Sequence, residues 1–383
     1  MTRPVVAHYN YEFCDRTETF IYNYVTNLKT FRSIYFADRI INLDMFPLPE
    51  RDVYAVPSGA PAKYTRRWIY GGLYKTFVDR GVSAEELILR ERKARLIHAH
   101  FGPQGFLALK LRGRLKIPII TTFYGYDLSL VAREPEWVAR YEALFKEGDL
   151  FLVEGEFMKS SLAELGCPKS RIQIQRIAVP LDKIPFVARR PKRDEEKVVI
   201  LFSGRFVEKK GVTDAVRAIA GLRAKHGHFE FRMIGDGPLR PEVEALIDDC
   251  RLGEHVKLLG FLSYDDYLEE MRKADIYFHP SVTASDGDSE GGAPTVILEA
   301  QATGLPVVTT SHADIPNVVV PGKSALLSKE RDVAGLTAHL AYLLEHRDQW
   351  ESMGAAGRRF VEQRHDLKKE LDTLEEKYRS VLA

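Results

Sequence analysis

Cysteine is scarce in this 383-residue sequence. Cys14, Cys167 and Cys250 lie far apart, and none belongs to a C-x-x-C pair of the kind that binds zinc or cycles between thiol and disulfide. Three widely spaced cysteines also provide no disulfide framework. The sequence therefore excludes the small disulfide-rich and zinc-finger classes, and it favours a reducing cytoplasm.

Long apolar runs are absent as well. No run approaches the roughly 20 apolar residues that a membrane-spanning helix needs, and residues 1–10 lack the apolar centre of a secretory signal peptide. We expect a cytoplasmic protein, and any association with the inner face of the membrane has to be peripheral.

Excess charge is absent overall but not locally. The net charge is +1, yet residues 1–190 hold 29 Lys and Arg against 21 Asp and Glu, while residues 191–383 hold 26 against 33. A basic front half is compatible with an anionic membrane surface or a phosphate-bearing substrate, and equally with a solvated face that binds nothing. The aromatic and basic segment 61–79 has two similar interpretations, a helix at a lipid interface or an ordinary amphipathic helix. We expect no nucleic-acid partner.

Glycine is missing from the first crossover loop. Val5–Tyr9 predicts a strand, and a helix is expected to follow it with Thr17 as its N-cap. Residues 10–16 between them contain no glycine. This argues against a phosphate cradle in a Gly-rich turn at this place.

The most metal-like pair of residues lacks a third ligand. His98 and His100 stand two residues apart on a predicted strand, so both side chains lie on one face of it. No further ligand with a fitting spacing is visible, and we expect no metal. The next predicted strand, residues 117–122, leads to Tyr124 and Asp127, which are candidates for a ligand cleft; a turn supported by Asp127 explains them as well.

Two series of alternating strands and helices follow each other along the chain. The charged segment 185–197 contains two prolines and predicts a linker between them. We therefore predict an α/β protein with two Rossmann-like doubly wound domains, residues 1–190 and 191–365, that face a central cleft. The C-terminal helix, residues 366–383, is a candidate to cross back to the front domain.

The stretch Ser285–Val308 is the most informative part of the second series. It lies between two apolar strand runs, and Pro294 and Gly304 suit the first turn and the end of a helix. The loop before this helix lies beyond the carboxyl end of a strand, where such sheets bind ligands. The helix start attracts anions, and Gly291 and Gly292 let a phosphate or a sugar approach the backbone.

Charged residues surround this loop. Glu290 and Glu299 bracket it and are suited to accept hydrogen bonds from the hydroxyls of a ribose or a hexose. Earlier in the second series, Gly204 opens a basic strand-to-helix loop in which Arg205 and Lys210 could both reach one diphosphate. The combination indicates a nucleotide-diphosphate sugar as ligand.

Five short motifs follow in order along the second half: Gly204-Arg205 with Lys210-Gly211, Gly235-Asp236-Gly237-Pro238, Leu259-Gly260, His279-Pro280-Ser281, and Glu290-Gly291-Gly292-Ala293-Pro294 running to Glu299-Ala300. As an ordered set, they resemble the retaining glycosyltransferases of family 4, which have the GT-B fold. The front half resembles the branch of that family that builds exopolysaccharide and colanic-acid-type chains. The motifs that carry this second resemblance are Thr17-Glu18-Thr19-Phe20, His98-Ala99-His100-Phe101-Gly102 and Thr122-Phe123-Tyr124-Gly125-Tyr126-Asp127.

The resemblance implies an enzyme that moves a hexose from a nucleotide-diphosphate sugar to a glycan or lipid-linked acceptor with retention of configuration. It implies a catalytic set of Arg205, Lys210 and Glu290, with the two cations on the donor diphosphate, and it implies that Glu299 accepts from the ribose hydroxyls. The other donor-site residues that it implies are Gly204, Gly235, Leu262, Gly291, Gly292, Ala293 and Pro294. On the acceptor side it implies Thr17, His100, Tyr124 and Asp127.

Two features depart from the family pattern. Eight residues separate Glu290 from Glu299 where the family usually has seven, so the loop has to bulge or Glu290 lies elsewhere. Tyr124-Gly125 stands where the family commonly has a His-Gly pair. Because an ordinary phenol has a pKa near 10, Tyr124 cannot carry a proton at neutral pH as a histidine could.

No metal or other cofactor is expected. Two fixed cations and a helix N-terminus can stabilise a departing diphosphate without a metal, and the resemblance places Asp286-Gly287-Asp288 at the rim of the donor loop. Two alternatives remain open: a nucleotide-sugar epimerase of the same fold, and a protein that binds sugar nucleotides without turnover.

Overall fold

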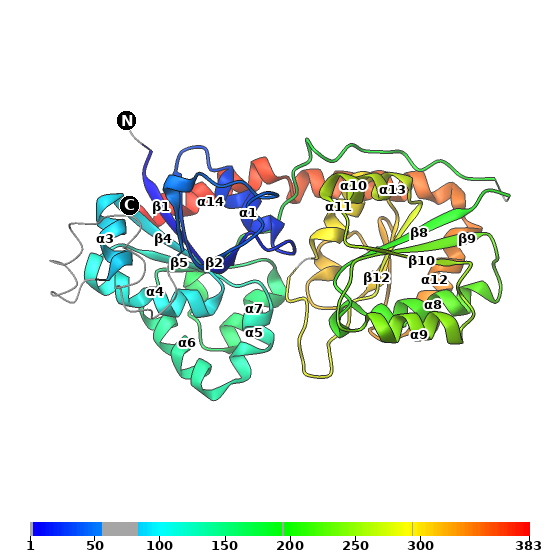
Figure 1. Ribbon diagram of the computed structural model, residues 1–383, viewed down its shortest axis with the longest axis horizontal. Helices are drawn as coiled ribbons and strands as arrows, with labels where there is room; N and C mark the ends of the chain where they lie inside the picture. Colours follow the sequence, from blue (N-terminus) through cyan, green and yellow to red (C-terminus); the bar gives the residue numbers. More distant parts are fainter. Residues whose placement is uncertain (1–2, 56–82, 194, 293) are drawn as a thin grey trace. The chain divides into compact units, whose positions relative to one another are not determined.

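The computed structural model describes residues 3–55, 83–193, 195–292 and 294–383. The chain forms two compact units (Figure 1). The first unit comprises Met1–Glu154, Lys159–Gln175 and Leu367–Ala383, and the second comprises Gly155–Met158 and Arg176–Asp366. The segment 61–79 and its two interpretations lie outside the described residues, and so does Ala293.

The first unit is built on a parallel sheet with the strand order β3-β2-β1-β4-β5-β6-β7. Its strands are β1 (Val5–Phe13), β2 (Arg32–Ile40), β3 (Val53–Ala55), β4 (Ala94–His100), β5 (Ile119–Thr122), β6 (Leu150–Val153) and β7 (Ile172–Ile174). The helices of this unit are α1 (Thr19–Thr26), α3 (Ala84–Glu91), α4 (Gly102–Leu115), α5 (Tyr126–Ser129), α6 (Pro135–Glu147) and α14 (Leu367–Leu382). Helix α7 (Glu156–Glu164) spans the division between the two units.

The two faces of this sheet differ in chemistry. One face is apolar: Ala7, Ile97 and Ala99 pack with Leu89 of α3 and Leu111 of α4. Because strand side chains alternate, the neighbouring positions of β1 and β4 point to the opposite face, where α1 and α14 lie. That second face carries polar side chains, which are described with the site below.

Helix α14 is tied to the first unit by specific hydrogen bonds. Glu375 is buried, and its Oε1 accepts from the backbone N–H groups of Lys29 (2.6 Å) and Thr30 (2.7 Å). The Tyr378 hydroxyl lies 2.6 Å from Nδ1 of His98, in the middle of the sheet. The last helix of the chain therefore completes the unit that begins with the first strand.

One cap predicted from the sequence is wrong. Helix α1 begins at Thr19 with Glu18 as its N-cap residue, so Thr17 does not cap it. Both the backbone N–H and the hydroxyl of Thr17 instead donate to Oδ1 of Asp15, at 2.6 Å each. Thr17 therefore lies one residue before the N-cap position and belongs to the turn at Asp15, and within the described residues the side chain of Glu18 makes no capping hydrogen bond to the first N–H groups of α1.

The second unit is built on a parallel sheet with the strand order β10-β9-β8-β11-β12-β13. Its strands are β8 (Val198–Ser203), β9 (Phe229–Ile234), β10 (Val256–Gly260), β11 (Ile276–His279), β12 (Val307–Thr310) and β13 (Ala325–Ser328). Its helices are α8 (Val212–Arg223), α9 (Arg240–Asp249), α10 (Tyr264–Lys273), α11 (Thr295–Thr303), α12 (Val333–Glu345) and α13 (Trp350–Arg364). Numbered within the unit, this order is 3-2-1-4-5-6, the order of a dinucleotide-binding sheet.

The division between the units falls at Gln175 and Arg176 rather than at residue 190. The segment that follows Arg176 packs on the second unit through its backbone and through Arg189. The Arg189 guanidinium donates to the carbonyls of Met271 (3.0 Å) and Arg272 (2.6 Å), and Val187 N–H donates to the Thr303 carbonyl (2.9 Å). The prolines and charged residues of this segment precede β8, but the boundary between the two units lies earlier in the sequence, at Gln175 and Arg176.

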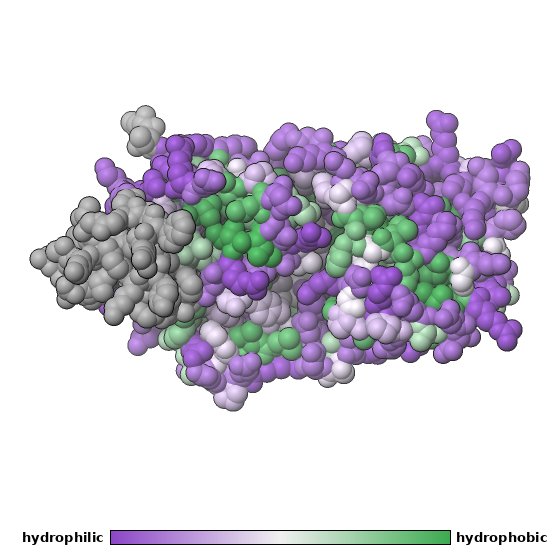
Figure 2. Space-filling view, in the orientation of Figure 1, coloured by the Kyte–Doolittle hydropathy of each residue, from purple (hydrophilic) through white to green (hydrophobic). Residues whose placement is uncertain are grey.

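Most large exposed apolar side chains stand apart from one another in the sequence, as with Tyr11, Val138 and Phe261. Hydrophilic residues cover most of the face shown in Figure 2, and the hydrophobic areas between them are separate. None of the helices in the described part of the chain combines the length and the apolar character that crossing a membrane requires.

Candidate functional site

The candidate site of the second unit lies where its strand order reverses. Strands β8 and β11 are neighbours, and their crossovers lead to opposite sides of the sheet. The loops that leave the carboxyl ends of these two strands therefore diverge, and ligands of such sheets bind in the crevice between diverging loops. The first loop carries Gly204, Arg205 and Lys210, and the second leads to Glu290.

Backbone packing brings the two loops together. Gly211 has φ +62°, and a Cβ there would lie 1.9 Å from the carbonyl oxygen of Pro280. Only glycine tolerates that approach. The loop after β8 is also tied to the acidic loop by Lys209, whose Nζ lies 2.9 Å from Oδ2 of Asp288. Asp288 of the Asp286-Gly287-Asp288 run is thus already neutralised by a lysine.

Lys210 and Glu290 form a buried ion pair. Lys210 Nζ donates to Glu290 Oε2 at 2.8 Å, and both side chains are shielded from solvent. Burial alone would raise the pKa of Glu290, but Lys210, His279 and Lys209 together outweigh it and hold that pKa well below its ordinary value. The pair is therefore ionised at neutral pH, and two of the three residues expected to form the catalytic set are in direct contact.

Further polar groups hold Glu290 in place, and sequence reasoning did not assign them. The Ser281 hydroxyl donates to Glu290 Oε1 (2.8 Å), and Glu290 N–H donates to Nε2 of His312 (3.0 Å). His279 is fully buried with Nε2 3.5 Å from Glu290 Oε1, and neither of its ring nitrogens has a hydrogen-bond partner in the described part of the chain. Ser281 and His279 belong to a motif quoted above, whereas His312 follows the next strand and gave no signal.

A tight turn follows Glu290. Gly291 has φ +73°, and Gly292 N–H donates to the Glu290 carbonyl at 3.0 Å. Helix α11 starts at Thr295 with Pro294 as its N-cap residue, and it ends at Gly304 as expected. The turn leaves Glu290 beside Lys210.

Glu299 is buried in α11 beside two tyrosines. Its Oε2 accepts from the Tyr267 hydroxyl (2.7 Å) and its Oε1 from the Tyr264 hydroxyl (3.3 Å). Burial raises the pKa of Glu299 to about 7, and the two hydroxyls only partly oppose this. The two tyrosines stand three residues apart on α10, a spacing that puts them on one helix face, and this was the signal that sequence reasoning passed over.

The remaining donor-side candidates differ in exposure. Arg205 is exposed and makes no ion pair or hydrogen bond within the described residues. Gly235, with φ +128°, leaves no room for a side chain because a Cβ would lie 2.0 Å from the Gly204 carbonyl oxygen, so it supports the loop after β8. Leu262 is half-buried at the edge of the core formed by Tyr267 and its neighbours.

In the first unit, Asp127 is a structural anchor. It is completely buried, and its carboxylate accepts from the backbone N–H groups of Gly102 (3.0 Å), Gly125 (2.9 Å) and Tyr124 (3.1 Å). Burial raises its pKa to about 6. The turn interpretation accounts for Asp127, and this residue fixes the backbone on both sides of Tyr124.

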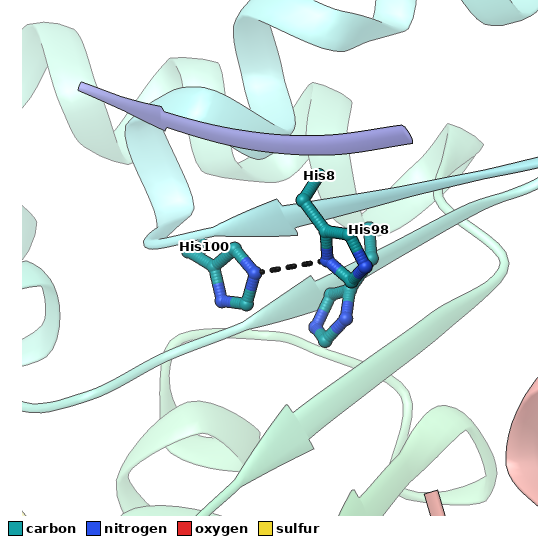
Figure 3. A group of neighbouring side chains, drawn as sticks. All are labelled: His8, His98 and His100. Carbon is teal, nitrogen blue, oxygen red and sulfur yellow. Dashed lines mark hydrogen bonds between the residues drawn. The ribbon is translucent and has the colours of Figure 1, made fainter. Parts of the chain in front are cut away.

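Tyr124 and His100 lie together at the reversal point of the first sheet, between β1 and β4. The Tyr124 hydroxyl lies 2.8 Å from Nδ1 of His100. The third histidine that the spacing did not reveal is His8 of β1, whose ring lies beside those of His98 and His100 (Figure 3). One ring nitrogen of each of the three residues falls within 4.8 Å of the others.

Each half of the chain matches a glycosyltransferase family model. Residues 46–183 match the family model "Glycosyltransferase Family 4", and residues 184–360 match "Glycosyl transferases group 1". Over 245 residues the chain is 36% identical to the putative colanic acid biosynthesis glycosyltransferase WcaL of Salmonella typhimurium, which covers 63% of this chain and 60% of that protein. Over 247 residues it is 35% identical to the amylovoran biosynthesis glycosyltransferase AmsK of Erwinia amylovora, covering 64% and 60%. The match thus spans about three fifths of the length of these relatives.

Solved structures share the fold. Anabaena HepE in complex with UDP superposes with a TM-score of 0.77 at 15% identity and covers 98% of this chain and 100% of its own. The sucrose-phosphate synthase of Thermosynechococcus elongatus superposes with a TM-score of 0.77 at 17% identity and covers 99% of both chains. Similarity at this level of identity shows that the two-sheet architecture is common to all three.

Proposed function

This chain belongs to the glycosyltransferases of family 4 and has their GT-B fold, and from that premise we propose that it transfers a hexose from a nucleotide-diphosphate sugar to a glycan or lipid-linked acceptor. The transfer retains the anomeric configuration and serves the synthesis of an exopolysaccharide or another cell-surface glycan.

The observation that carries the proposal is the buried Lys210–Glu290 pair at the reversal point of the second sheet, next to the start of α11. An ammonium group has three N–H donors, and Glu290 uses one of them. The others remain suited to a diphosphate, and the first N–H groups of α11 have no partner within the helix and favour an anion. Arg205, which is exposed and lacks a partner in the described part of the chain, supplies a second cation with a planar fork.

The chemistry follows from this charge distribution. As the bond between sugar and diphosphate breaks, positive charge develops on the sugar ring and negative charge on the leaving diphosphate. Two cations and a helix start that are already in place stabilise the leaving group without reorganisation. Glu290 carries its negative charge at neutral pH and orients the donor sugar through its hydroxyls. No step requires a metal.

Glu299 is assigned to the ribose. A carboxylate accepts hydrogen bonds from two adjacent hydroxyls, and Tyr264 and Tyr267 hold this one in a fixed position. The relatives named for colanic acid and amylovoran biosynthesis support a role in exopolysaccharide synthesis, and HepE with UDP supports a uridine donor as the first to test. A GDP-mannose-dependent mannosyltransferase of Mycobacterium tuberculosis, 30% identical over 166 residues, keeps GDP sugars among the candidates.

The test begins with a thermal-shift screen against UDP, GDP, ADP and dTDP sugars. A donor at about 100 times its Kd stabilises the native state by roughly 2.7 kcal/mol, and the melting temperature rises accordingly. The donor found is then incubated with and without glycolipid acceptors, and release of the nucleoside diphosphate and the anomeric configuration of the product are measured, in buffer with EDTA. We expect acceptor-dependent release that EDTA leaves unchanged, and a retained configuration.

Each of the two alternative functions predicts a different result in this assay. An epimerase converts the donor sugar without an acceptor, and a binding protein raises its melting temperature but releases no nucleoside diphosphate with any acceptor. Absence of stabilisation by every nucleotide sugar would refute the donor site itself.

A further inference from the structure

The three buried histidines of the first unit belong to two runs of hydrogen-bonded side chains on neighbouring strands. Ser33 stands on β2, His8 on β1, and His98 and His100 on β4, while Thr122 ends β5. The three rings lie together (Figure 3), on the face where Tyr378 of α14 hydrogen-bonds His98 and the Val25 carbonyl of α1 accepts from Ser33. Nothing in the proposed transfer uses His8, His98 or Ser33.

The direction of one bond in this run is fixed by a backbone carbonyl. The Ser33 hydroxyl lies 2.5 Å from the carbonyl oxygen of Val25, and a carbonyl can only accept. The single hydroxyl proton of Ser33 is therefore used there. His8 Nε2, 3.3 Å from the same hydroxyl oxygen, has to be the donor to it.

From this bond the protonation of the next two residues follows. A neutral imidazole carries one N–H, so His8 with its proton on Nε2 has an accepting Nδ1. The partner of that Nδ1 is Nε2 of His100 at 3.3 Å, which then donates. His100 Nδ1 is left as an acceptor, and the hydroxyl 2.8 Å from it, that of Tyr124, has to donate its proton inward.

His98 has hydrogen-bond partners of its own. Its Nε2 lies 2.7 Å from the Thr122 hydroxyl and its Nδ1 lies 2.6 Å from the Tyr378 hydroxyl. Because both partners are hydroxyls, which donate as well as accept, the tautomer of His98 is not fixed in the way that the Val25 carbonyl fixes those of His8 and His100.

Burial keeps the three rings neutral. It lowers the pKa of His98 to about 3, and it lowers the pKa of His8 and of His100 well below the ordinary value, with their mutual repulsion adding to the effect. An uncharged, fully hydrogen-bonded cluster is stable in a low-dielectric interior, whereas an unpaired charge is not.

We propose that His8 and His100 are positioning residues for Tyr124: with Ser33 they form a one-directional hydrogen-bond chain that draws the Tyr124 proton into the first unit and leaves its oxygen only the role of acceptor. The Tyr124 side chain is half-buried, with the rings of Phe20 (tilted) and Phe101 (edge-on) packed against it. A ligand that reaches its oxygen has to donate a hydrogen bond. If the proposed transfer is correct, this oxygen recognises a sugar hydroxyl and rejects phosphates and carboxylates.

A metal ion bound by the three histidines is the competing explanation of the cluster. Each ligand would need a free lone pair directed at the ion. The two nitrogens of His98 are held by Tyr378 and Thr122, and the accepting Nδ1 atoms of His8 and His100 are held by neighbouring donors. Occupation by a metal would break this chain, so the two explanations predict different results.

The test uses the full-length protein without any substrate, which separates it from the proposed function. Protein labelled with ¹⁵N-histidine is studied by long-range proton–nitrogen correlation from pH 6 to 9. We expect the three rings to be neutral throughout, and His8 and His100 to carry the proton on Nε2. A proton on Nδ1 of His8 or His100, or protonation of either ring within this range, would overturn the proposed direction.

Two variants test whether Ser33 sets the tautomers of His8 and His100. Ser33→Ala removes the terminal acceptor, and we expect the ring nitrogen signals of His8 and His100 to move toward a mixture of tautomers. Thr26→Ala removes a hydroxyl that donates to the Tyr22 carbonyl in the same helix but touches none of the rings, and it should leave these signals unchanged. Identical histidine spectra in Ser33→Ala and wild type would contradict the chain.

Metal binding and substrate use complete the test. One equivalent of Zn²⁺ or Co²⁺ should leave the three histidine signals in place, and stoichiometric binding that shifts all three would establish the metal site instead. Where transfer is measured, Ser33→Ala and Tyr124→Phe should both raise the KM for the acceptor while the KM for the donor is unchanged, and Thr26→Ala should change neither. An unchanged acceptor KM in both variants would remove Tyr124 from acceptor recognition and leave the tautomer result standing.

Discussion

The two units have sheets of nearly the same topology, and each places polar side chains where its strand order reverses, but the chemistry at the two points is opposite. At β8 and β11 the polar groups are charged: Lys210 and Glu290 form an ion pair within the protein. At β1 and β4 they are neutral rings and hydroxyls. The fold fixes where such groups gather, and the side chains decide whether the place suits an anion or a hydroxyl.

This difference predicts different responses to mild acid. The pKa values of His8, His98 and His100 are lowered on folding, so the unfolded chain binds more protons below the ordinary pKa of 6.5, and the free energy of unfolding falls as the pH is lowered. In the second unit, His279 and His365 act in the same direction and the raised pKa of Glu299 acts in the opposite one, while the lowered pKa of Glu290 matters only below the ordinary value of 4.5. Three clustered histidines against two make the first unit the more acid-labile, and Asp127, whose pKa is raised to about 6, reduces this difference.

The largest expected effect is acid opening of the first unit. At pH 5 His98, whose pKa is lowered to about 3, costs about 2 kcal/mol relative to neutral pH, and the lowered pKa values of His8 and His100 add to this loss in the same direction. Hydrogen exchange at pH 7.5 and pH 5, corrected for intrinsic rates, should show β1 and β4 losing protection before β8 and β11. His98→Gln, which cannot titrate, should shift the opening to lower pH. Earlier loss of protection in β8 and β11 would reverse the comparison.

The second largest effect is expected when the Lys210–Glu290 ion pair is broken. Lys210→Met leaves Glu290 buried without its partner, and we expect a loss of about 3–5 kcal/mol in the free energy of unfolding of the second unit. Turnover should fall by at least about 10²-fold. Lys273→Met, at an exposed ion pair on α10, is the control and should change stability by less than about 1 kcal/mol. The measurements are urea unfolding and release of the nucleoside diphosphate.

Arg205 sharpens this result. Arg205 and Lys210 are assigned the same role, on the donor diphosphate. The structure separates them, because Arg205 is exposed and Lys210 is paired and buried. Arg205→Met should therefore lose turnover without losing stability, and equal destabilisation in the two variants would contradict the distinction.

The smallest effect concerns Glu299. Its pKa of about 7 exceeds the ordinary value of 4.5, so its contribution to the free energy of unfolding is complete below pH 4.5 and falls by about 3 kcal/mol as the pH rises through 7. Glu299→Gln should remove this slope from the unfolding curves of the second unit between pH 5 and 7.5, and Glu351→Gln, an exposed change on α13, should keep it. Parallel curves for wild type and Glu299→Gln would show that Glu299 does not titrate in this range.

Patterns along the chain predicted the second unit well. The two apolar strand runs around Ser285–Val308 are β11 and β12, and α11 ends at Gly304 as predicted, because buried parallel strands are continuous apolar runs and glycine ends helices. Contacts between distant segments were not predictable. His8 precedes His98 by 90 positions, and only the pairing of β1 with β4 brings them side by side.

Local competition explains the other differences. Thr17 has the residue type of a cap, but Asp15 two positions away takes both of its donors. Glu299 was expected to be open to a ligand, and the tyrosines that hold it come from another helix. In each case the residue type was informative, but its hydrogen-bond partner could be identified only from the three-dimensional structure.

The attachment of α14 sets an order for synthesis. Translation proceeds from β1 to α14, and Glu375 and Tyr378 are needed to cap the α1–β2 turn and to close the histidine face. The stretch from Arg176 to Asp366 is uninterrupted and can pack as soon as it leaves the ribosome. The half of the protein that is made first is thus finished last, and its polar interior stays open to water until the final helix arrives.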